Sequence, residues 1–226
     1  MANNALSTLQ NLPGAFNELL RLTEEEYDID YTIIDLNPSL SAINQNLFLS
    51  SSAFVLPTNP DPFSIMTIDT LKTTLPRWAG WKQSALSTFS GAAYPLAPGV
   101  PKFVGSLIQR FNIRKGRPAK PYRDNIQEIK DRITDQFVIA LEPAGMALTT
   151  EQYGRLVRDE FCLAEIPDFQ GLLPKSQNAG VPVFALEDDE MGETGPILSG
   201  LVEKRDLFRD QFAEIANKLV DLLEYA

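Results

Sequence analysis

Two short apolar runs, each followed by a turn and a helix-like segment, constrain the fold of this chain most strongly. The runs are YTIIDL (31–36) and AFVLPT (53–58). Neither alternates strictly between apolar and polar residues, which is typical of strands covered on both faces in a parallel sheet. Helical patterns follow over 39–49, with Ser39 as the expected N-cap, and over 65–78, with a Thr or Ser cap. Repeated strand–turn–helix units predict an α/β fold, with a mostly parallel sheet flanked by helices.

The rest of the sequence extends this pattern through what we expect to be a single domain, 1–226. Further helices are expected over residues 13–26, 121–136, 147–163 and 197–224. KFVGSLIQRF (102–111) predicts a third strand, and FCLAEIPD (161–168) and VPVFAL (181–186) predict short strands or extended segments. QFVIAL (136–141) fits either a fourth strand or a helix end. The Gly/Pro-rich segment 90–101 predicts a surface loop.

Residue types that are absent exclude several kinds of chemistry. The chain contains no histidine and a single cysteine, Cys162, which excludes Ser-His-Asp and Cys-His catalysis and the usual zinc sites. Any metal would be a hard cation such as Mg²⁺ on oxygen ligands. One cysteine forms no internal disulfide, and the N-terminal residues do not resemble a secretory signal, so we expect a cytoplasmic protein. No apolar run approaches the roughly 18 residues of a membrane span.

A phosphate-binding loop of the P-loop type is not recognisable in the sequence. Such loops place glycines between a strand and a helix and end in Gly-Lys-Ser/Thr, so that backbone N–H groups and the lysine reach the phosphates. None of the 13 glycines is followed by lysine. Asp35, at the end of the first apolar run, therefore has no phosphate-binding partner that the sequence reveals. From spacing alone, it also fits an aspartate that caps the following turn.

Several motifs nevertheless occur in an order typical of one family. YTIIDLNPSL is followed by Asn46, and AFVLPTNPDPFS contains Pro57, Pro60 and Asp61. Further on, EIPDFQGLLPKSQNAGVPVFAL begins Ile-Pro and carries Gly180, Pro182 and Val183 near its end. From Tyr31 onward, these motifs resemble the ParA/MinD partition ATPases, the deviant-Walker class of P-loop NTPases.

The resemblance implies an ATP site with Mg²⁺. Asp35 would be the Walker B residue that holds Mg²⁺ mainly through water. The loop Asn37-Pro38-Ser39 would be the switch that senses the γ-phosphate. Gln109 and Arg110 would approach the base from one side, and Pro167 and Asp168 would flank the adenine from the other.

The chain also departs from the family. Leu36-Asn37 replaces the commoner Thr-Pro after the aspartate, and the family's P-loop and switch I aspartate are missing. In relatives the P-loop strand lies between the strands equivalent to 31–36 and 53–58, so we expect either a gap in the sheet or direct pairing of these two. We therefore expect the C-terminal two-thirds of such an ATPase: a fragment, an internal start or one half of a split protein. Neither ATP hydrolysis nor tight nucleotide binding is expected from this chain alone.

A basic stretch contrasts with the acidic chain, whose net charge is −10 and pI about 4.6. RFNIRKGRPAKPYR carries no acid before Asp124. Because contacts to DNA phosphates need only positive charge, and the family binds DNA non-specifically, these are candidate DNA-binding residues: Arg114, Lys115, Arg117, Lys120 and Arg123. A solvated loop is the alternative. We expect the acidic run 187–193 to be an exposed loop.

The expected function is ATP-dependent dimerisation that partitions plasmid or chromosomal DNA or positions another cargo. The partner would be a second copy or a P-loop-containing N-terminal half. The alternative is a pseudo-ATPase interaction module, which dimerises or binds a partner through the exposed sheet region and the area of Trp78 and Trp81. These tryptophans fit the core or an interface, and Cys162 fits a buried core thiol.

Overall fold

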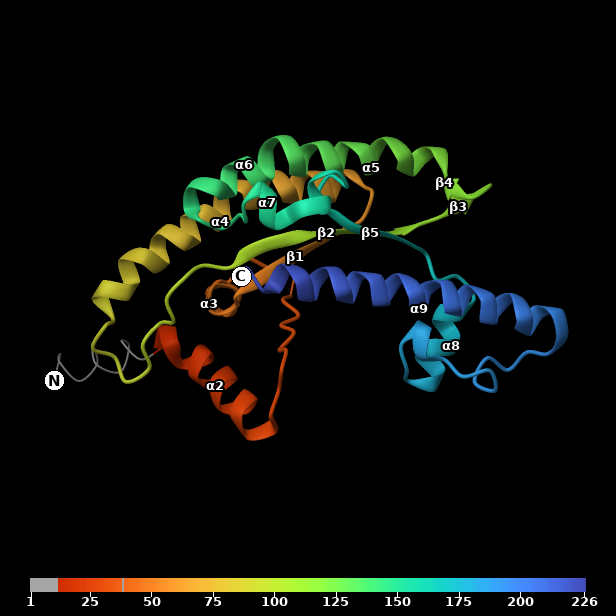
Figure 1. Cartoon of the computed structure of the whole chain (residues 1–226), viewed down its shortest axis with the longest axis horizontal. Helices are drawn as coiled ribbons and strands as arrows, with labels where there is room; N and C mark the ends of the chain where they lie inside the picture. Colours follow the sequence, from red (N-terminus) through yellow and green to blue (C-terminus); the bar gives the residue numbers. More distant parts are fainter. Residues whose placement is uncertain (1–11, 38) are drawn as a thin grey trace.

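The computed structural model describes residues 12–37 and 39–226, and its centre is a parallel sheet. The sheet has three strands in the order β1 (Ala53–Thr58), β2 (Lys102–Phe111) and β5 (Cys162–Pro167) (Figure 1). Both neighbouring pairs are parallel. The α/β class with a parallel sheet flanked by helices is thus confirmed, and β1 and β2 have the bounds that the sequence predicts.

Helices cover the sheet on both sides. α4 (Pro62–Thr88), α5 (Lys120–Arg132), the π-helix η1 (Ile133–Phe137) and α6 (Val138–Leu141) lie above the sheet in Figure 1. The long helix α9 (Gly195–Leu223) runs below it, with α8 (Leu172–Ala179) beneath the first half of α9. The remaining elements are α2 (Leu12–Tyr27), α3 (Ala42–Ser50), the hairpin β3 (Ile113–Arg114) and β4 (Arg117–Pro118), α7 (Thr150–Tyr153), and the 3₁₀ turns η2 (Glu142–Ala144), η3 (Gly154–Val157) and η4 (Val183–Ala185).

The expected strand over 31–36 is wrong. This segment has neither helical nor strand structure and is drawn-out chain between α2 and α3 (Figure 1). Ile33 is 93 % exposed and Tyr31 is exposed, whereas Leu36 packs against the main core cluster. A preference for extended backbone does not by itself supply a hydrogen-bonding neighbour, and among the described strands β1 pairs only with β2. The expected alternatives are a gap in the sheet or direct pairing of 31–36 with 53–58. The structure excludes the direct pairing, and β1 is the end strand of the described sheet.

Several helix boundaries also differ from expectation. The N-cap of α3 is Ser41 rather than Ser39, because the Ser41 side chain accepts from the Asn44 N–H. The N-cap of α4 is Asp61 rather than a Thr or Ser. The helix contains Pro76 without ending there, and it continues beyond residue 78 to Thr88. Residues 136–141 are helical. The expected helix over 147–163 is wrong. This segment forms only the two short turns α7 and η3 before β5 begins at Cys162.

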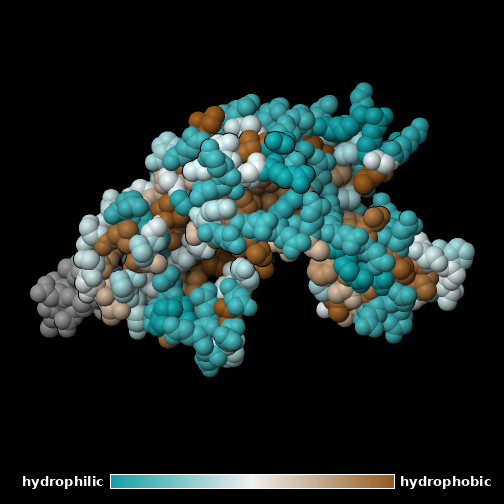
Figure 2. Space-filling model, viewed as in Figure 1, coloured by the Kyte–Doolittle hydropathy of each residue, from teal (hydrophilic) through white to brown (hydrophobic). Residues whose placement is uncertain are grey.

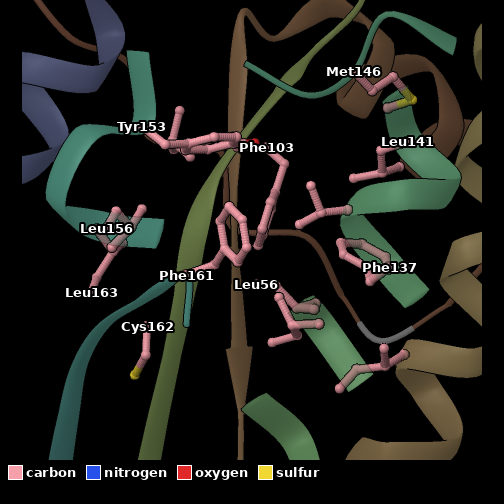
Figure 3. Packing of buried hydrophobic residues seen from close by; sticks show 14 of the residues in the cluster. Leu56, Phe103, Phe137, Leu141, Met146, Tyr153, Leu156, Phe161, Cys162 and Leu163 are labelled. Carbon is pink, nitrogen blue, oxygen red and sulfur yellow. The ribbon is translucent and has the colours of Figure 1, made fainter. Parts of the chain in front are cut away.

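The main core lies between the sheet and the helices above it. The Phe103 ring of β2 is fully buried and lies 5.3 Å from the ring of Phe137 and 5.4 Å from that of Phe54 (Figure 3). Cys162 lies in this cluster and burial raises the pKa of its thiol to about 11, which confirms the expected core thiol. Trp78 is partly buried against Phe48, at 5.8 Å between ring centroids.

A second core cluster lies between the end of β5, α8 and α9. Its buried members include Ile166, Leu172, Phe208 and Ile215. The apolar residues that recur every three or four positions along α9, among them Phe208, Phe212 and Ile215, thus face inward. Figure 2 shows a hollow between the lobe of α2 and the lobe of α8 and α9, with apolar atoms along its roof.

β2 carries a glycine with a structural role. Gly105 has a φ of +126°, and the pairing of β1 with β2 shifts register between Phe54 and Leu56, opposite this position. A Cβ at Gly105 would meet Leu163 Cγ at 2.8 Å. Glycine alone tolerates both this backbone conformation and the close approach of β5.

Candidate functional site

The carboxyl ends of β2 and β5 bring four of the expected site residues together. Gln109 pairs with Ile166, and Phe111 pairs with Pro167, so Gln109 and Arg110 lie beside Pro167 and Asp168. The Asp168 N–H donates to the Phe111 carbonyl at 2.9 Å, which holds the two strand ends together beyond the ladder. In open α/β sheets, ligands bind outside the carboxyl ends of the strands.

The groups at this edge favour binding rather than acid–base chemistry. Arg110 is exposed with a φ of 63°, and it forms no ion pair with the described residues. The Asp168 carboxylate is exposed and accepts from the Gln170 N–H at 2.6 Å. The edge therefore offers an amide, a guanidinium and backbone groups to a polar heterocycle or an anion. Among the described residues it places no nucleophile within hydrogen-bonding reach of a base.

The end of β1 adds a residue that sequence reasoning missed. The backbone N–H of Asn59 donates to Ser64 Oγ at 3.0 Å, and the side chain of Asn125 donates to the Pro60 carbonyl at 3.0 Å. The Oδ1 atom of Asn59 is buried and has no hydrogen-bond partner among the residues that the structure describes. A buried, unpartnered acceptor at the carboxyl edge of a sheet is unusual and marks a position for a donor. Asn59 lies inside the Pro-x-x-Pro-acid motif, which could have pointed to it.

Asp35 and the expected switch loop occupy the connection to α3. The buried Asn44 side chain donates to the carbonyls of Asn37 and Ser39, both at 2.7 Å, and to Asn37 Oδ1 at 3.1 Å. Pro38 lies outside the described residues. Asn44, rather than the Asn46 quoted in the family motif, thus holds the loop. Asn46 Oδ1 is buried and has no hydrogen-bond partner within residues 12–37 and 39–226.

A metal site is not preformed in the described part of the chain. Asp35 is exposed, and its carboxylate makes no hydrogen bond or ion pair with another described residue. No group of three or more His, Cys, Asp or Glu side chains within residues 12–37 and 39–226 is arranged to hold a metal ion. A lone carboxylate fits Mg²⁺ only when substrate phosphates supply further ligands. Asp35 could therefore hold Mg²⁺ only jointly with a bound nucleotide.

The basic stretch forms a projecting hairpin. β3 and β4 pair antiparallel, Ile113 with Pro118 and Arg114 with Arg117, and extend from the end of β2 (Figure 1). All the candidate DNA-binding side chains are exposed, and none has an ion-pair partner among the described residues: Arg114, Lys115, Arg117, Lys120 and Arg123. The structure thus gathers unneutralised positive charge on the hairpin and the first turn of α5.

The acidic run, in contrast, is partly neutralised. Glu187, Asp188, Asp189 and Glu190 are exposed, as expected, but Met191 of the same run is fully buried. The buried Arg205 of α9 donates to the carboxylates of Asp188 at 2.7 Å and Asp206 at 2.9 Å. Arg205 also donates to the Leu186 carbonyl, so it fixes this loop on α9.

Comparison with known proteins supports an ATPase class for the first part of the chain. Residues 1–87 match a protein-family model described as an AAA domain. This region contains Asp35, the loop 37–39, β1 and almost all of α4. No curated protein and no solved structure matches the chain. In the described residues, none of the helices combines the length and apolarity needed to cross a bilayer.

Proposed function

We propose that this chain is part of a ParA/MinD-like partition ATPase in the cytoplasm and forms the base-binding side of its nucleotide site. The pairing of β2 with β5 carries the proposal, because it sets Gln109 and Arg110 beside Pro167 and Asp168 at the carboxyl edge. The AAA-domain match over residues 1–87 supports the same class independently. Adenine would lie between these two pairs of residues.

The phosphates would be bound on the side of β1 and α3. Asp35 would hold Mg²⁺ together with phosphate oxygens, and the loop that includes Asn37 and Ser39 would respond to the γ-phosphate. A P-loop lysine and glycine-rich turn would come from a P-loop-containing N-terminal half or partner, since no glycine of this chain precedes a lysine. Bound Mg²⁺ would neutralise the charge that develops on the phosphates during hydrolysis.

Calorimetry with Mg-ATP tests this proposal. We expect no measurable heat with the chain alone, and micromolar binding after co-expression with a polypeptide that carries a Gly-Lys-Ser/Thr loop and is encoded directly upstream. Gln109→Ala should weaken that binding by about tenfold, corresponding to about 1.4 kcal/mol. Asp189→Ala, in the exposed acidic run, should leave it unchanged. Binding that is equally tight in the Gln109→Ala variant would reject the assignment of the base site.

A second candidate function is a pseudo-ATPase module that binds a partner. The observation in its favour is that apolar side chains in and just after segment 31–36 are exposed, namely Tyr31, Ile33, Leu40 and Ile43. The DNA directly upstream of the reading frame discriminates between the two. An in-frame P-loop segment supports the ATPase, whereas a stop codon and a ribosome-binding site before Met1 support the module.

A further inference from the structure

Asn59 lies at the carboxyl edge of the sheet, one strand away from the proposed base site. It directly follows β1, whose last residue, Thr58, pairs with Ile108 of β2. Gln109 is the next residue of β2, so continuing the register by one residue sets Asn59 beside Gln109. Neighbouring strands lie about 4.8 Å apart. Asn59 is therefore about one strand spacing from Gln109, on the side of β1.

The backbone of Asn59 is fixed by two hydrogen bonds. Its N–H donates to Ser64 Oγ at 3.0 Å, and its carbonyl accepts from the Asp61 N–H at 2.8 Å. The Asp61 carboxylate in turn accepts from the Ser64 N–H at 2.8 Å and so caps α4. These bonds hold the turn between β1 and α4 in one shape, which gives the Asn59 side chain a defined starting point.

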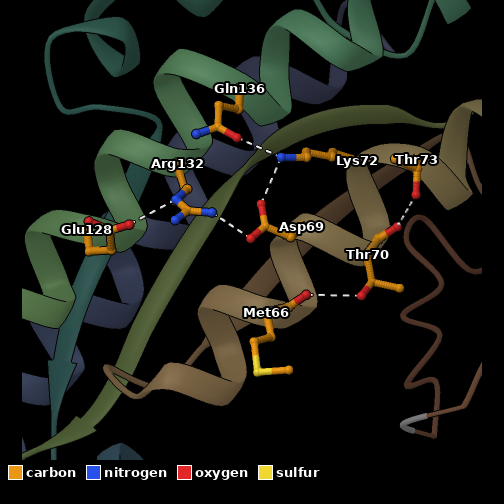
Figure 4. Close-up of polar contacts among 8 residues, drawn as sticks. All are labelled: Met66, Asp69, Thr70, Lys72, Thr73, Glu128, Arg132 and Gln136. Carbon is orange, nitrogen blue, oxygen red and sulfur yellow. Dashed lines mark hydrogen bonds and ion pairs between the residues drawn. The ribbon is translucent and has the colours of Figure 1, made fainter.

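Helix α5 braces the same turn. Asn125 of α5 donates to the Pro60 carbonyl at 3.0 Å. Further along the two helices, Arg132 of α5 donates to the Asp69 carboxylate of α4 at 2.5 Å (Figure 4). A ligand at this end of β1 thus meets a frame that is already assembled, as a precise binding contact requires.

The carboxamide of Asn59 is the unpaired part of this turn. Its Oδ1 atom is buried, and no described residue donates to it. A buried acceptor without a donor is costly. The residue as a whole is only half-buried, and the terminal torsion of an asparagine has a broad energy profile. Rotation about one bond can therefore turn Oδ1 toward a donor that arrives at the edge.

The chemistry of Oδ1 decides which part of a nucleotide it fits. Phosphate oxygens are acceptors, so they do not pair with an amide oxygen. The base is assigned to the ends of β2 and β5, and the phosphates to the side of β1 and α3. The sugar joins the two and would cross the end of β1, where its hydroxyl groups supply donors. In dinucleotide-binding α/β sheets, an oxygen acceptor likewise holds a ribose hydroxyl.

We propose that Asn59 determines specificity for ribose, because its Oδ1 accepts a hydrogen bond from a ribose hydroxyl of the bound nucleotide. This inference rests on the proposed function, from which it takes the position of the base. It adds a contact residue and a selectivity. A ribonucleotide binds in preference to an analogue without the hydroxyls, since the analogue leaves Oδ1 unpaired.

NMR titration of this chain with nucleosides tests the contact. Nucleosides carry a base and a sugar but no phosphate, so a P-loop is not needed to bind them. We expect adenosine to bind with a dissociation constant of about 1 mM. The analogue 2′,3′-dideoxyadenosine lacks both hydroxyls and should bind about tenfold more weakly.

Variants at position 59 assign the preference to one atom. Asn59→Ala removes the acceptor, so it should bind adenosine as weakly as the wild type binds dideoxyadenosine. Asn59→Asp keeps an oxygen acceptor and should restore the preference. Asn217→Ala, the same change at an exposed asparagine of α9, is the matched control and should keep it. Urea unfolding should show Asn59→Ala to be no less stable than the wild type, because the change removes a buried unpaired oxygen.

The outcomes separate this inference from the proposed function. If neither nucleoside binds the wild type, the base site is rejected together with the ribose contact. If the wild type binds both nucleosides equally, or if Asn59→Ala keeps the preference, the ribose contact alone is overturned and the base site stands. A preference that is lost in Asn59→Ala and regained in Asn59→Asp supports the ribose contact.

Discussion

At the scale of single residues, Tyr153 shows how a buried polar group is held. Its hydroxyl donates to the Phe103 carbonyl at 2.9 Å and accepts from the Leu148 N–H at 3.3 Å. Burial raises the pKa of the phenol to about 12, from its usual value near 10. The hydroxyl thus ties α7 to the core strand β2 and is costly to remove or ionise.

We expect Tyr153→Phe to lower the free energy of unfolding by about 1–2 kcal/mol, because it removes both buried hydrogen bonds of the hydroxyl and takes away the acceptor of the Leu148 N–H. The wild-type protein should also lose stability as the pH rises from about 10 to 12, since the unfolded state releases the phenolic proton first. The variant should lack that part of the loss. Urea unfolding at several pH values measures both effects, and Tyr225→Phe, at an exposed position, serves as the control. An unchanged alkaline slope in Tyr153→Phe would contradict the assignment.

At the scale of elements, the geometry of β2 depends on Gly105. Replacement by alanine would combine an unfavourable positive φ with the 2.8 Å approach of Leu163 Cγ. We expect Gly105→Ala to lower the free energy of unfolding by about 2 kcal/mol or more. Gly200→Ala, inside α9 with no atom within 4 Å of the new Cβ, should instead raise it by about 0.5–1 kcal/mol. Chemical denaturation of the two variants measures both changes in the free energy of unfolding. If the two glycine-to-alanine changes had equal effects, strain at Gly105 would not be the cause.

At the scale of the whole molecule, charge is segregated rather than mixed. The β3–β4 hairpin and the start of α5 carry five exposed cations without an ion-pair partner among the described residues, whereas the run 187–193 carries five carboxylates and no cation. A net charge of −10 opposes approach to DNA, so any binding has to use the hairpin.

If the hairpin binds DNA, replacing Arg114, Lys115 and Arg117 with alanine should weaken binding to random-sequence duplex. Each lost phosphate contact should also reduce the slope of log K against log salt by about 0.9. Fluorescence anisotropy across a salt series measures both quantities. Lys204→Ala, an exposed cation of α9, should leave them unchanged. A slope that is the same in the triple variant and the wild type would favour a solvated hairpin.

The predictions from sequence succeed where a local pattern meets a partner within the chain. AFVLPT and KFVGSLIQRF pair with each other, and α9 buries the stripe that its spacing indicates. YTIIDL has the same composition as a buried strand but no strand beside it, so its pattern predicts a structure that it does not form. The predicted N-cap of α3 is wrong for a related reason. Ser39 and Ser41 are equally good candidates in the sequence, and only the path of the backbone decides that Ser41 accepts from the Asn44 N–H.

The sequence by itself determined the α/β class, the strands β1 and β2 and the long amphipathic helix. It also excluded the kinds of chemistry that require histidine, because the chain has none. Only the tertiary structure decided which side chains meet. It sets Gln109 and Arg110 beside Pro167 and Asp168, and Asn44 holds the loop 37–39. It also leaves Asn59 Oδ1 buried without a hydrogen-bond partner among the described residues. The physical reason is that periodicity records which residues avoid water, whereas strand order, register and packing decide what each of them contacts.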